Sequence, residues 1–156
     1  DWSKDRIIPD IIRSIYNKKK FFIRNPNAVR PWQHIIELSL GYLILAERLF
    51  KSPLQFSSSY NFGPSKQNFK NVKYIHDFFF NVNKSMNFNK KKSTEYAENP
   101  YLTLDTSYTH KMLKWKSKLS LDESLSLTNE WYKLYYKGYN MFEYSTTQFK
   151  EYLKIY

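Results

Sequence analysis

Arginines, prolines, side-chain amides and an indole are concentrated in one short segment, Arg24–His34. An arginine guanidinium presents a planar fork of donors that fits a phosphate group. Pro26 and Pro31 restrict the backbone that would hold such a fork in place. Because a long apolar helical pattern follows at once, the segment predicts a site for a phosphorylated ligand at the start of a rigid helix.

Each polar side chain of this segment has a ligand-binding and a structural interpretation. Arg30 either clamps a diphosphate through a bidentate contact or pairs with a carboxylate at the helix start. Arg24 either contacts the ligand or holds the turn and faces solvent. Asn25 and Gln33 either donate hydrogen bonds to a ligand or satisfy backbone groups. The two remaining large side chains are interpreted as structural: Trp32 and His34.

Other chemistry is missing from the sequence. There is no cysteine, which excludes disulfides, thiolate catalysis and cysteine-ligated metal sites. The glycines are too far apart for a phosphate-binding loop: Gly41, Gly63 and Gly138. The histidines show no metal-binding spacing: His34, His76 and His110. We therefore expect no cofactor-binding or metal-binding residue in this chain.

Composition and charge limit the function classes. With 156 residues, 42% of them hydrophobic, the chain is long enough for a core and is interpreted as one domain, 1–156. The most apolar stretch, Leu38–Ala46, is too short to span a bilayer. A cytoplasmic location is expected, which the absence of cysteine fits. The net charge of +11 favours an anionic partner. The basic runs Lys18–Lys20 and Lys90–Lys92 do not gather on one predicted element, which favours a solvated surface over a nucleic-acid site.

The elements that must position these residues follow from hydrophobic periodicity. Helices are predicted at Arg6–Lys19, Gln33–Lys51, Val72–Val82, 121–136 and 146–156. A short helix that ends at Leu113 is predicted with Ser107 as its cap. Strands are predicted at Phe21–Ile23, Tyr60–Phe62, Met86–Phe88 and Tyr101–Asp105, and loops at Ser57–Ser59 and Asn89–Asn99. Ser120 and Glu123 form a capping box. Strands alternating with helices indicate a small mixed α/β domain.

The helix predicted at Gln33–Lys51 is apolar over much of its surface. Its main stripe is expected to be Ile35, Leu38, Tyr42, Leu45 and Leu49, extended sideways by Ile36, Leu40 and Leu43. Such a helix is buried on several sides. One of those sides is a candidate contact for a partner outside this chain.

The segment Arg24–His34 resembles the characteristic turn of the CDP-glucose 4,6-dehydratases, a branch of the extended short-chain dehydrogenase/reductase family. Most members of the wider family carry glycine, aspartate and glycine where this chain has Arg24, Asn25 and Pro26. Further segments carry the resemblance: Asp1–Asp10, Tyr60–Pro64, Leu113–Trp115, Leu119, Leu121–Leu125, Trp131 and Tyr132. The resemblance covers nearly the whole chain and corresponds to the family's C-terminal substrate-binding half.

The resemblance implies roles for individual residues. Arg30 falls on the arginine that contacts the sugar-nucleotide diphosphate. Glu98, seven residues before Asp105, falls on an acidic residue that reaches the nucleotide end of the ligand. Asp5 and Arg6 lie where the family's chain wraps the nucleotide. The full set of implied substrate-binding residues is Arg30, Arg24, Asn25, Gln33, Arg6, Asp5 and Glu98.

The chain also departs from the family's pattern. A histidine-rich segment is usual where this chain has residues 95–100. Proline is usual at Ser117, and valine-leucine-glutamate-proline is usual where this chain has Ile35, Ile36, Glu37 and Leu38.

As a whole enzyme, the resemblance implies a hydro-lyase that holds NAD in an N-terminal Rossmann domain absent from this chain. Such an enzyme converts CDP-glucose to CDP-4-keto-6-deoxyglucose for deoxysugar and lipopolysaccharide synthesis. The family's catalytic tyrosine, lysine and threonine lie in the absent half, so this chain alone is expected to be inactive. Asp1 follows the family's glycine triplet directly, which leads us to expect a fragment, a split subunit or a truncated reading frame.

The expected partners are CDP-glucose, a Rossmann domain on the same or another chain, and further copies of the complete enzyme. No membrane partner is expected. Two alternatives stay open from the sequence. One is a basic nucleic-acid-binding module, and the other is a non-catalytic remnant that pairs with a separate Rossmann subunit.

Overall fold

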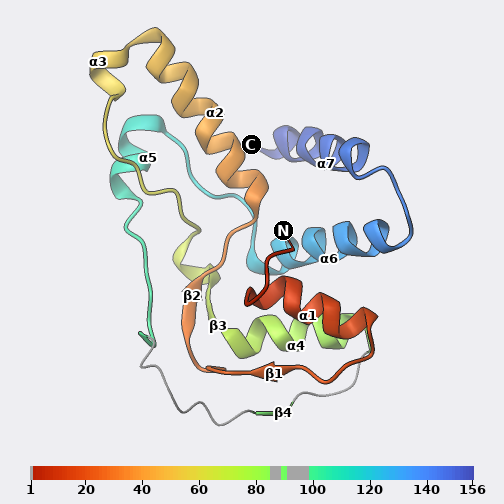
Figure 1. Ribbon diagram of the computed structural model, residues 1–156. Helices are drawn as coiled ribbons and strands as arrows, with labels where there is room; N and C mark the ends of the chain where they lie inside the picture. Colours follow the sequence, from red (N-terminus) through yellow and green to blue (C-terminus); the bar gives the residue numbers. More distant parts are fainter. Residues whose placement is uncertain (1, 85–88, 91–98) are drawn as a thin grey trace. The chain divides into compact units, whose positions relative to one another are not determined.

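The structure is a computed structural model that describes residues 2–84, 89–90 and 99–156 (Figure 1). The helices are α1 (Ile7–Tyr16), α2 (Ile35–Lys51), α3 (Pro53–Phe56), α4 (Val72–Val82), α5 (Ser107–Leu113), α6 (Leu121–Tyr136) and α7 (Met141–Ile155). The strands are β1 (Phe22–Ile23), β2 (Val29–Pro31), β3 (Phe69–Asn71) and β4 (Asn89–Lys90), and η1 (Lys66–Asn68) is a short 3-10 helix. This mostly helical mixture with short strands confirms the predicted α/β class.

The chain divides into two compact units. The first comprises residues 1–30 and 70–102, and the second comprises residues 31–69 and 103–156. Strands β1 and β4 pair in parallel, with Phe22 opposite Asn89 and Ile23 opposite Lys90. Strands β2 and β3 form a second pair. The chain passes from one unit to the other between residues 30 and 31, 69 and 70, and 102 and 103. That residues 1–156 act as one substrate-binding domain stays a prediction.

The first unit is built on α1 and α4, which pack side by side (Figure 1). The isoleucine spacing of α1 places Ile11 and Ile12 in the core, where both are fully buried. From α4, Ile75 and Phe79 are equally buried. Helix α4 has the predicted bounds, and the side chain of Asn71 caps it by accepting a hydrogen bond of 2.9 Å from the Tyr74 backbone N–H.

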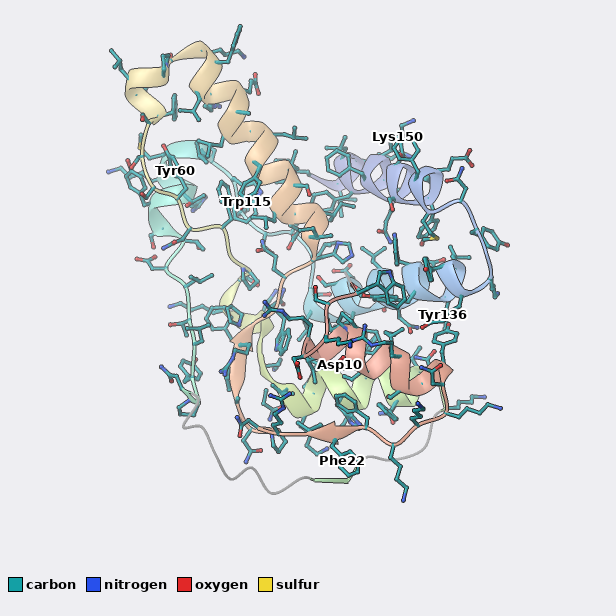
Figure 2. All side chains as sticks on the ribbon, viewed as in Figure 1. Asp10, Phe22, Tyr60, Trp115, Tyr136 and Lys150 are labelled. Atoms are coloured by element: carbon teal, nitrogen blue, oxygen red, sulfur yellow. The ribbon has the colours of Figure 1, made fainter. Side chains whose placement is uncertain are left out.

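The second unit packs aromatic side chains against α2. Trp115 is 1% exposed and lies beside α2 (Figure 2), with its ring centroid 5.0 Å from that of Phe62. Gly41 of α2 permits this approach, because a Cβ there would lie 2.6 Å from the Phe62 ring. A second buried group in this unit comprises Ile36, Leu40, Leu119 and Tyr152.

The exposed face of α2 differs from the prediction. Ile36 and Leu40 are buried, whereas Ile35 and Tyr42 of the predicted stripe are 66% and 57% exposed. The buried face of α2 is therefore the side that carries Glu37 and Gly41. Glu37 accepts buried hydrogen bonds there, and Gly41 leaves room for the ring of Phe62. Within the predicted stripe, Ile35 and Tyr42 are left exposed, whereas Leu45 and Leu49 pack against the buried group of Phe56, Leu113 and Trp115.

Two strand predictions are wrong. Residues 60–62 do not form a strand, and no described residue pairs with them as a neighbouring strand. Instead, the carbonyl of Asn61 accepts a hydrogen bond of 2.8 Å from the Thr109 hydroxyl. Residues 101–105 contribute only an isolated bridge, between Tyr101 and Val29. Runs this short adopt strand pairing only where a partner backbone is available.

The remaining local predictions are mixed. The capping box is confirmed, since the Ser120 hydroxyl accepts from the Glu123 N–H while the Glu123 carboxylate accepts from the Ser120 N–H. The last helix begins at Met141 rather than Thr146, because Asn140 caps it. The N-cap position of α5 is occupied by Thr106 rather than by the predicted Ser107, which is the first residue of the helix. Residues 89 and 90 form β4 rather than the start of a loop, and the strand predicted at 86–88 lies outside the described residues.

Candidate functional site

The predicted phosphate-binding turn is fixed to the start of α4 by main-chain hydrogen bonds. The turn closes on itself, with the Ala28 N–H donating to the Asn25 carbonyl at 3.2 Å. The N–H groups of Val72 and Lys73 donate to the carbonyls of Ala28 and Pro26 at 3.0 and 2.9 Å. The backbone of the turn is therefore held in place by main-chain hydrogen bonds to itself and to the start of α4.

Arg30 leaves this turn from β2 and is oriented by carbonyl oxygens. Its Nη1 donates to the Val29 carbonyl at 2.8 Å and to the Asn99 carbonyl at 3.0 Å. The segment that carries Asn99 runs alongside, because the Val29 N–H donates to Pro100 at 2.8 Å and the Leu102 N–H donates to Val29 at 3.2 Å. Arg30 as a whole is partly buried. Both of these acceptors are uncharged carbonyl oxygens, so these two contacts do not neutralise the positive charge of Arg30.

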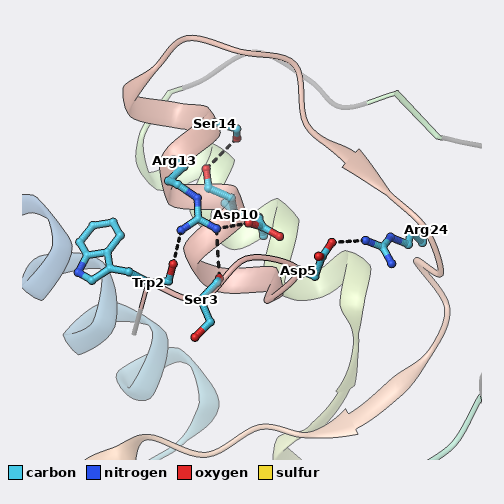
Figure 3. Close-up of polar contacts among 8 residues, drawn as sticks. Trp2, Ser3, Asp5, Asp10, Arg13, Ser14 and Arg24 are labelled. Atoms are coloured by element: carbon cyan, nitrogen blue, oxygen red, sulfur yellow. Dashed lines mark hydrogen bonds and ion pairs between the residues drawn. The ribbon is translucent and has the colours of Figure 1, made fainter.

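Arg24 and Asp5 form an ion pair across the first unit (Figure 3). Arg24 Nη2 lies 2.5 Å from Asp5 Oδ1. Both side chains are exposed, at 71% for Arg24 and 74% for Asp5. The backbone of Asp5 has φ of 61°, a left-handed conformation that aspartate tolerates better than most residues. Two of the predicted site residues, 19 positions apart, are thus brought into contact.

Arg13 holds the N-terminal segment that leads to Asp5 (Figure 3). It donates to the carbonyls of Trp2 at 2.8 Å and Ser3 at 3.2 Å, and it pairs with Asp10. The sequence signal for this arrangement is the spacing of Asp10 and Arg13, three residues apart on a predicted helix. Arg6 precedes α1 at its N-cap position with an exposed side chain.

Gln33 and His34 begin the second unit. The Nε2 of Gln33 is buried and has no hydrogen-bond partner among the described residues. His34 caps α2, since its Nδ1 accepts a hydrogen bond of 3.2 Å from the Ile36 N–H. Burial lowers the pKa of His34 to about 4, so the ring is neutral at neutral pH. This confirms the interpretation of His34 as a structural histidine.

The predicted site residues thus fall into separate groups. Asp5, Arg6, Arg24, Asn25 and Arg30 lie in the first unit, and Asp5 contacts Arg24 directly. Gln33 lies in the second unit. Glu98 lies outside the described residues, although its neighbour Asn99 contacts Arg30. Their roles towards a ligand stay predictions.

A buried carboxylate in the second unit was missed from the sequence. Glu37 is fully buried. Its Oε1 accepts from the N–H groups of Lys118 at 2.6 Å and Leu119 at 2.9 Å and from the Tyr152 hydroxyl at 3.4 Å, and its Oε2 accepts from the Ser117 hydroxyl at 2.9 Å. Burial and the Glu37 charge raise the pKa of Tyr152. These donors account for the burial of the charge, so Glu37 acts as a structural anchor.

A second missed group, His76 and Asp77, lies on α4. His76 is 2% exposed and stacks on Phe80 with a centroid distance of 4.2 Å. Its Nδ1 lies 3.0 Å from the Asp77 carboxylate, which also pairs with Lys73. Burial lowers the pKa of His76, against the opposing effect of Asp77. His76 therefore belongs to the core of the first unit, whereas Asp77 is partly exposed at its edge.

Neither a metal site nor a membrane span is found in the described part of the chain. No three histidine, aspartate or glutamate side chains there are grouped to hold a metal ion. No described helix is both long and apolar enough to cross a bilayer. The three glycines lie in separate elements or loops, so these residues offer no glycine-rich cradle that fits NAD.

Comparison with known proteins supports the resemblance noted in the sequence. The chain is 35% identical over 154 residues, 98% of its length, to CDP-glucose 4,6-dehydratase of Salmonella typhimurium. It spans 43% of that protein's length, so less than half of the relative is represented here. No protein-family model matches the chain.

A solved structure shares the fold. The Bordetella bronchiseptica enzyme WbmG, determined in complex with NAD and UDP, matches with a TM-score of 0.56 over 83% of this chain and 40% of that enzyme. The sequence identity is 17%, so this likeness concerns the fold alone. Both matched proteins extend well beyond the part that this chain resembles.

Proposed function

We propose that this chain is the sugar-nucleotide-binding part of an NAD-dependent CDP-glucose 4,6-dehydratase. The observation that carries the proposal is the 35% identity to CDP-glucose 4,6-dehydratase over 98% of the chain. The main-chain anchoring of the turn at residues 25–28 supports it, because a phosphate-binding side chain needs a fixed base.

In the proposed reaction the C4 hydroxyl of the glucose is oxidised, water is lost across C5 and C6, and the hydride returns to C6. NAD supplies the hydride acceptor and donor for this sequence. The chain's own contribution is to bind and orient the nucleotide end of CDP-glucose. We expect the catalytic residues in a part of the enzyme that this chain does not match.

Arg30 is the proposed clamp for the diphosphate. Its guanidinium is oriented by the carbonyls of Val29 and Asn99, so its direction is set before a ligand arrives. A charge-assisted contact from such a fork is stronger than a neutral hydrogen bond. The other proposed substrate-binding residues are Arg24, Asn25, Gln33, Arg6, Asp5 and Glu98.

The proposed partner is a Rossmann domain on the same or another chain. More than half of the Salmonella relative lies outside the matched part. Helix α2 leaves large apolar side chains uncovered within its own unit, including Ile35, Tyr42 and Phe50. A partner domain that covered this face would remove apolar area from water. Further copies of the complete enzyme and a cytoplasmic setting are part of the same proposal.

The proposal is tested by calorimetric titration of CDP-glucose into the 156-residue chain and two variants. Arg30→Ala is expected to weaken binding at least about tenfold, since a charge-assisted contact contributes about 1.5–3 kcal/mol. Lys150→Ala removes the same charge from an exposed position on α7 and serves as the matched control. Saturable wild-type binding that Arg30→Ala leaves intact would contradict the role of Arg30. Absence of wild-type binding would contradict an autonomous site in this chain.

A further inference from the structure

We propose that Asp5 occupies the place of a ligand phosphate on Arg24, so that ligand binding exchanges the Asp5 carboxylate for a phosphate. This inference rests on the proposed function, since it concerns the same site. Within the described residues, Arg24 contacts Asp5 through one nitrogen, Nη2, at 2.5 Å (Figure 3). The rest of its donor fork has no described partner, so the contact is single where a phosphate contact would be bidentate.

The pair is easily opened. Arg24 is 71% exposed and Asp5 is 74% exposed, so water and salt screen their attraction. Exposed ion pairs of this kind contribute little to stability. The diphosphate of a nucleotide sugar carries two negative charges against one on a carboxylate, and its oxygens match the guanidinium fork, so we expect it to displace Asp5 from Arg24.

The position of Asp5 does not depend on this ion pair. Arg13 holds the carbonyls of Trp2 and Ser3, and Asp10 in turn pairs with Arg13. The segment before Asp5 is therefore fixed from α1 rather than from Arg24. Asp5 can release Arg24 without unfolding the segment, and its charge can be removed without moving its backbone.

The consequence is that Asp5, although it lies among the proposed substrate-binding residues, acts on the ligand through Arg24 and opposes its binding. A carboxylate beside Arg24 disfavours every anion that approaches the guanidinium, because the anion must displace Asp5 and is repelled by its charge. Removal of Asp5 should tighten anion binding, whereas removal of a residue that contacts the ligand should weaken it.

Asp5→Asn is the decisive variant. Asparagine keeps the shape and tolerates the left-handed φ of 61°, while the charge is lost. Asp5→Gly, which also accepts this conformation, serves as a second variant. Glu151→Gln is the matched control, because it removes a carboxylate from an exposed ion pair with Lys154 in the second unit.

The experiment compares the dissociation constants of CDP and inorganic pyrophosphate for the wild-type chain, Asp5→Asn, Arg24→Gln and the double variant. Asp5→Asn is expected to bind both anions about two- to fivefold more tightly than wild type. The gain is expected to vanish in the Arg24→Gln background and to shrink at high salt. Glu151→Gln is expected to bind as wild type does.

The outcomes separate this inference from the proposed function. Wild-type binding of CDP with an unchanged or weakened Asp5→Asn would overturn the exchange at Arg24 and leave the proposed function standing. Tighter, Arg24-dependent pyrophosphate binding by Asp5→Asn without any CDP binding would support the exchange and contradict the nucleotide site. Failure of every variant to bind either anion would overturn both.

Discussion

The hydroxyl of Ser117 donates a hydrogen bond of 2.9 Å to the buried carboxylate of Glu37, 80 positions earlier in the chain. In the family that the chain resembles, proline is usual at the position of Ser117, and its side chain has no hydrogen-bond donor. The serine supplies one of four donors to a charge that is entirely withdrawn from water. The start of α2 is thereby tied to the segment that leads into α6.

Glu37→Gln should destabilise the second unit strongly. The amide would set its own N–H donors against backbone N–H groups of Lys118 or Leu119, leaving buried donors unsatisfied. We expect a loss of about 3 kcal/mol in the free energy of unfolding. Urea unfolding of Glu37→Gln and of Ser117→Ala, which removes only one donor, measures the difference. A loss below about 0.5 kcal/mol for Glu37→Gln would mean that the carboxylate is not buried as described.

Acid should destabilise the chain through His34. Its pKa is lowered to about 4 in the folded state against an ordinary value of 6.5, so the unfolded state binds the proton more tightly. The stability that the neutral ring contributes is present above pH 6.5 and is lost as the pH falls towards about 4.

The matched variant for this effect is His34→Asn, because asparagine can cap α2 without titrating in this range. The slope of the free energy of unfolding against pH should become shallower between pH 6.5 and about 4. The remaining slope is expected to include His76, whose pKa is lowered by burial as well. An unchanged slope in His34→Asn would show that its protonation does not differ between the folded and unfolded states.

Gly41→Ala should destabilise the second unit although alanine favours helices. The new methyl group would lie 2.6 Å from the Phe62 ring, and overpacking costs about 1–3 kcal/mol. Helix propensity returns about 1 kcal/mol. Thermal unfolding should show a lower melting temperature for Gly41→Ala, and Phe62→Leu in the same chain should relieve part of the loss. A raised melting temperature in the single variant would contradict the close approach.

The exposed face of α2 should cause self-association of the isolated chain. Phe50 is 90% exposed and Tyr42 is 57% exposed, and large uncovered apolar side chains promote contacts between molecules. Phe50→Glu and Tyr42→Lys are expected to lower the apparent mass in light scattering at equal concentration. A wild-type chain that stays monomeric at high concentration would contradict this expectation.

Local signals in the sequence predicted local structure well. The bounds of α4 and the capping box at Ser120 and Glu123 are set by residues within a few positions of each other. The short strands were predicted less well, because Tyr60–Phe62 has strand-like composition but no described partner strand. Strand pairing depends on residues distant in sequence.

At the candidate site, too, local features could be predicted from the sequence and long-range contacts could not. The turn at residues 25–28 and the structural nature of His34 could be predicted from residue types and spacing. The strand β2, which separates this turn from α2, was not predicted, so the turn does not lead directly into α2 as expected. The contact of Asp5 with Arg24 and the carbonyl ligands of Arg30 could not, because they join residues 19 and 69 positions apart. The burial of Glu37 also escaped prediction, although a glutamate within the apolar run Ile35–Leu40 was a signal for a satisfied buried charge.

Hydrogen–deuterium exchange of the chain with and without CDP-glucose tests the central claim most directly. A sugar-nucleotide site at the turn predicts slower exchange at the amides of residues 24–30 and 99–102 when the ligand is present, with no change in α6 and α7. Protection confined to α6 and α7, or no ligand-dependent change anywhere, would contradict a sugar-nucleotide site at this turn.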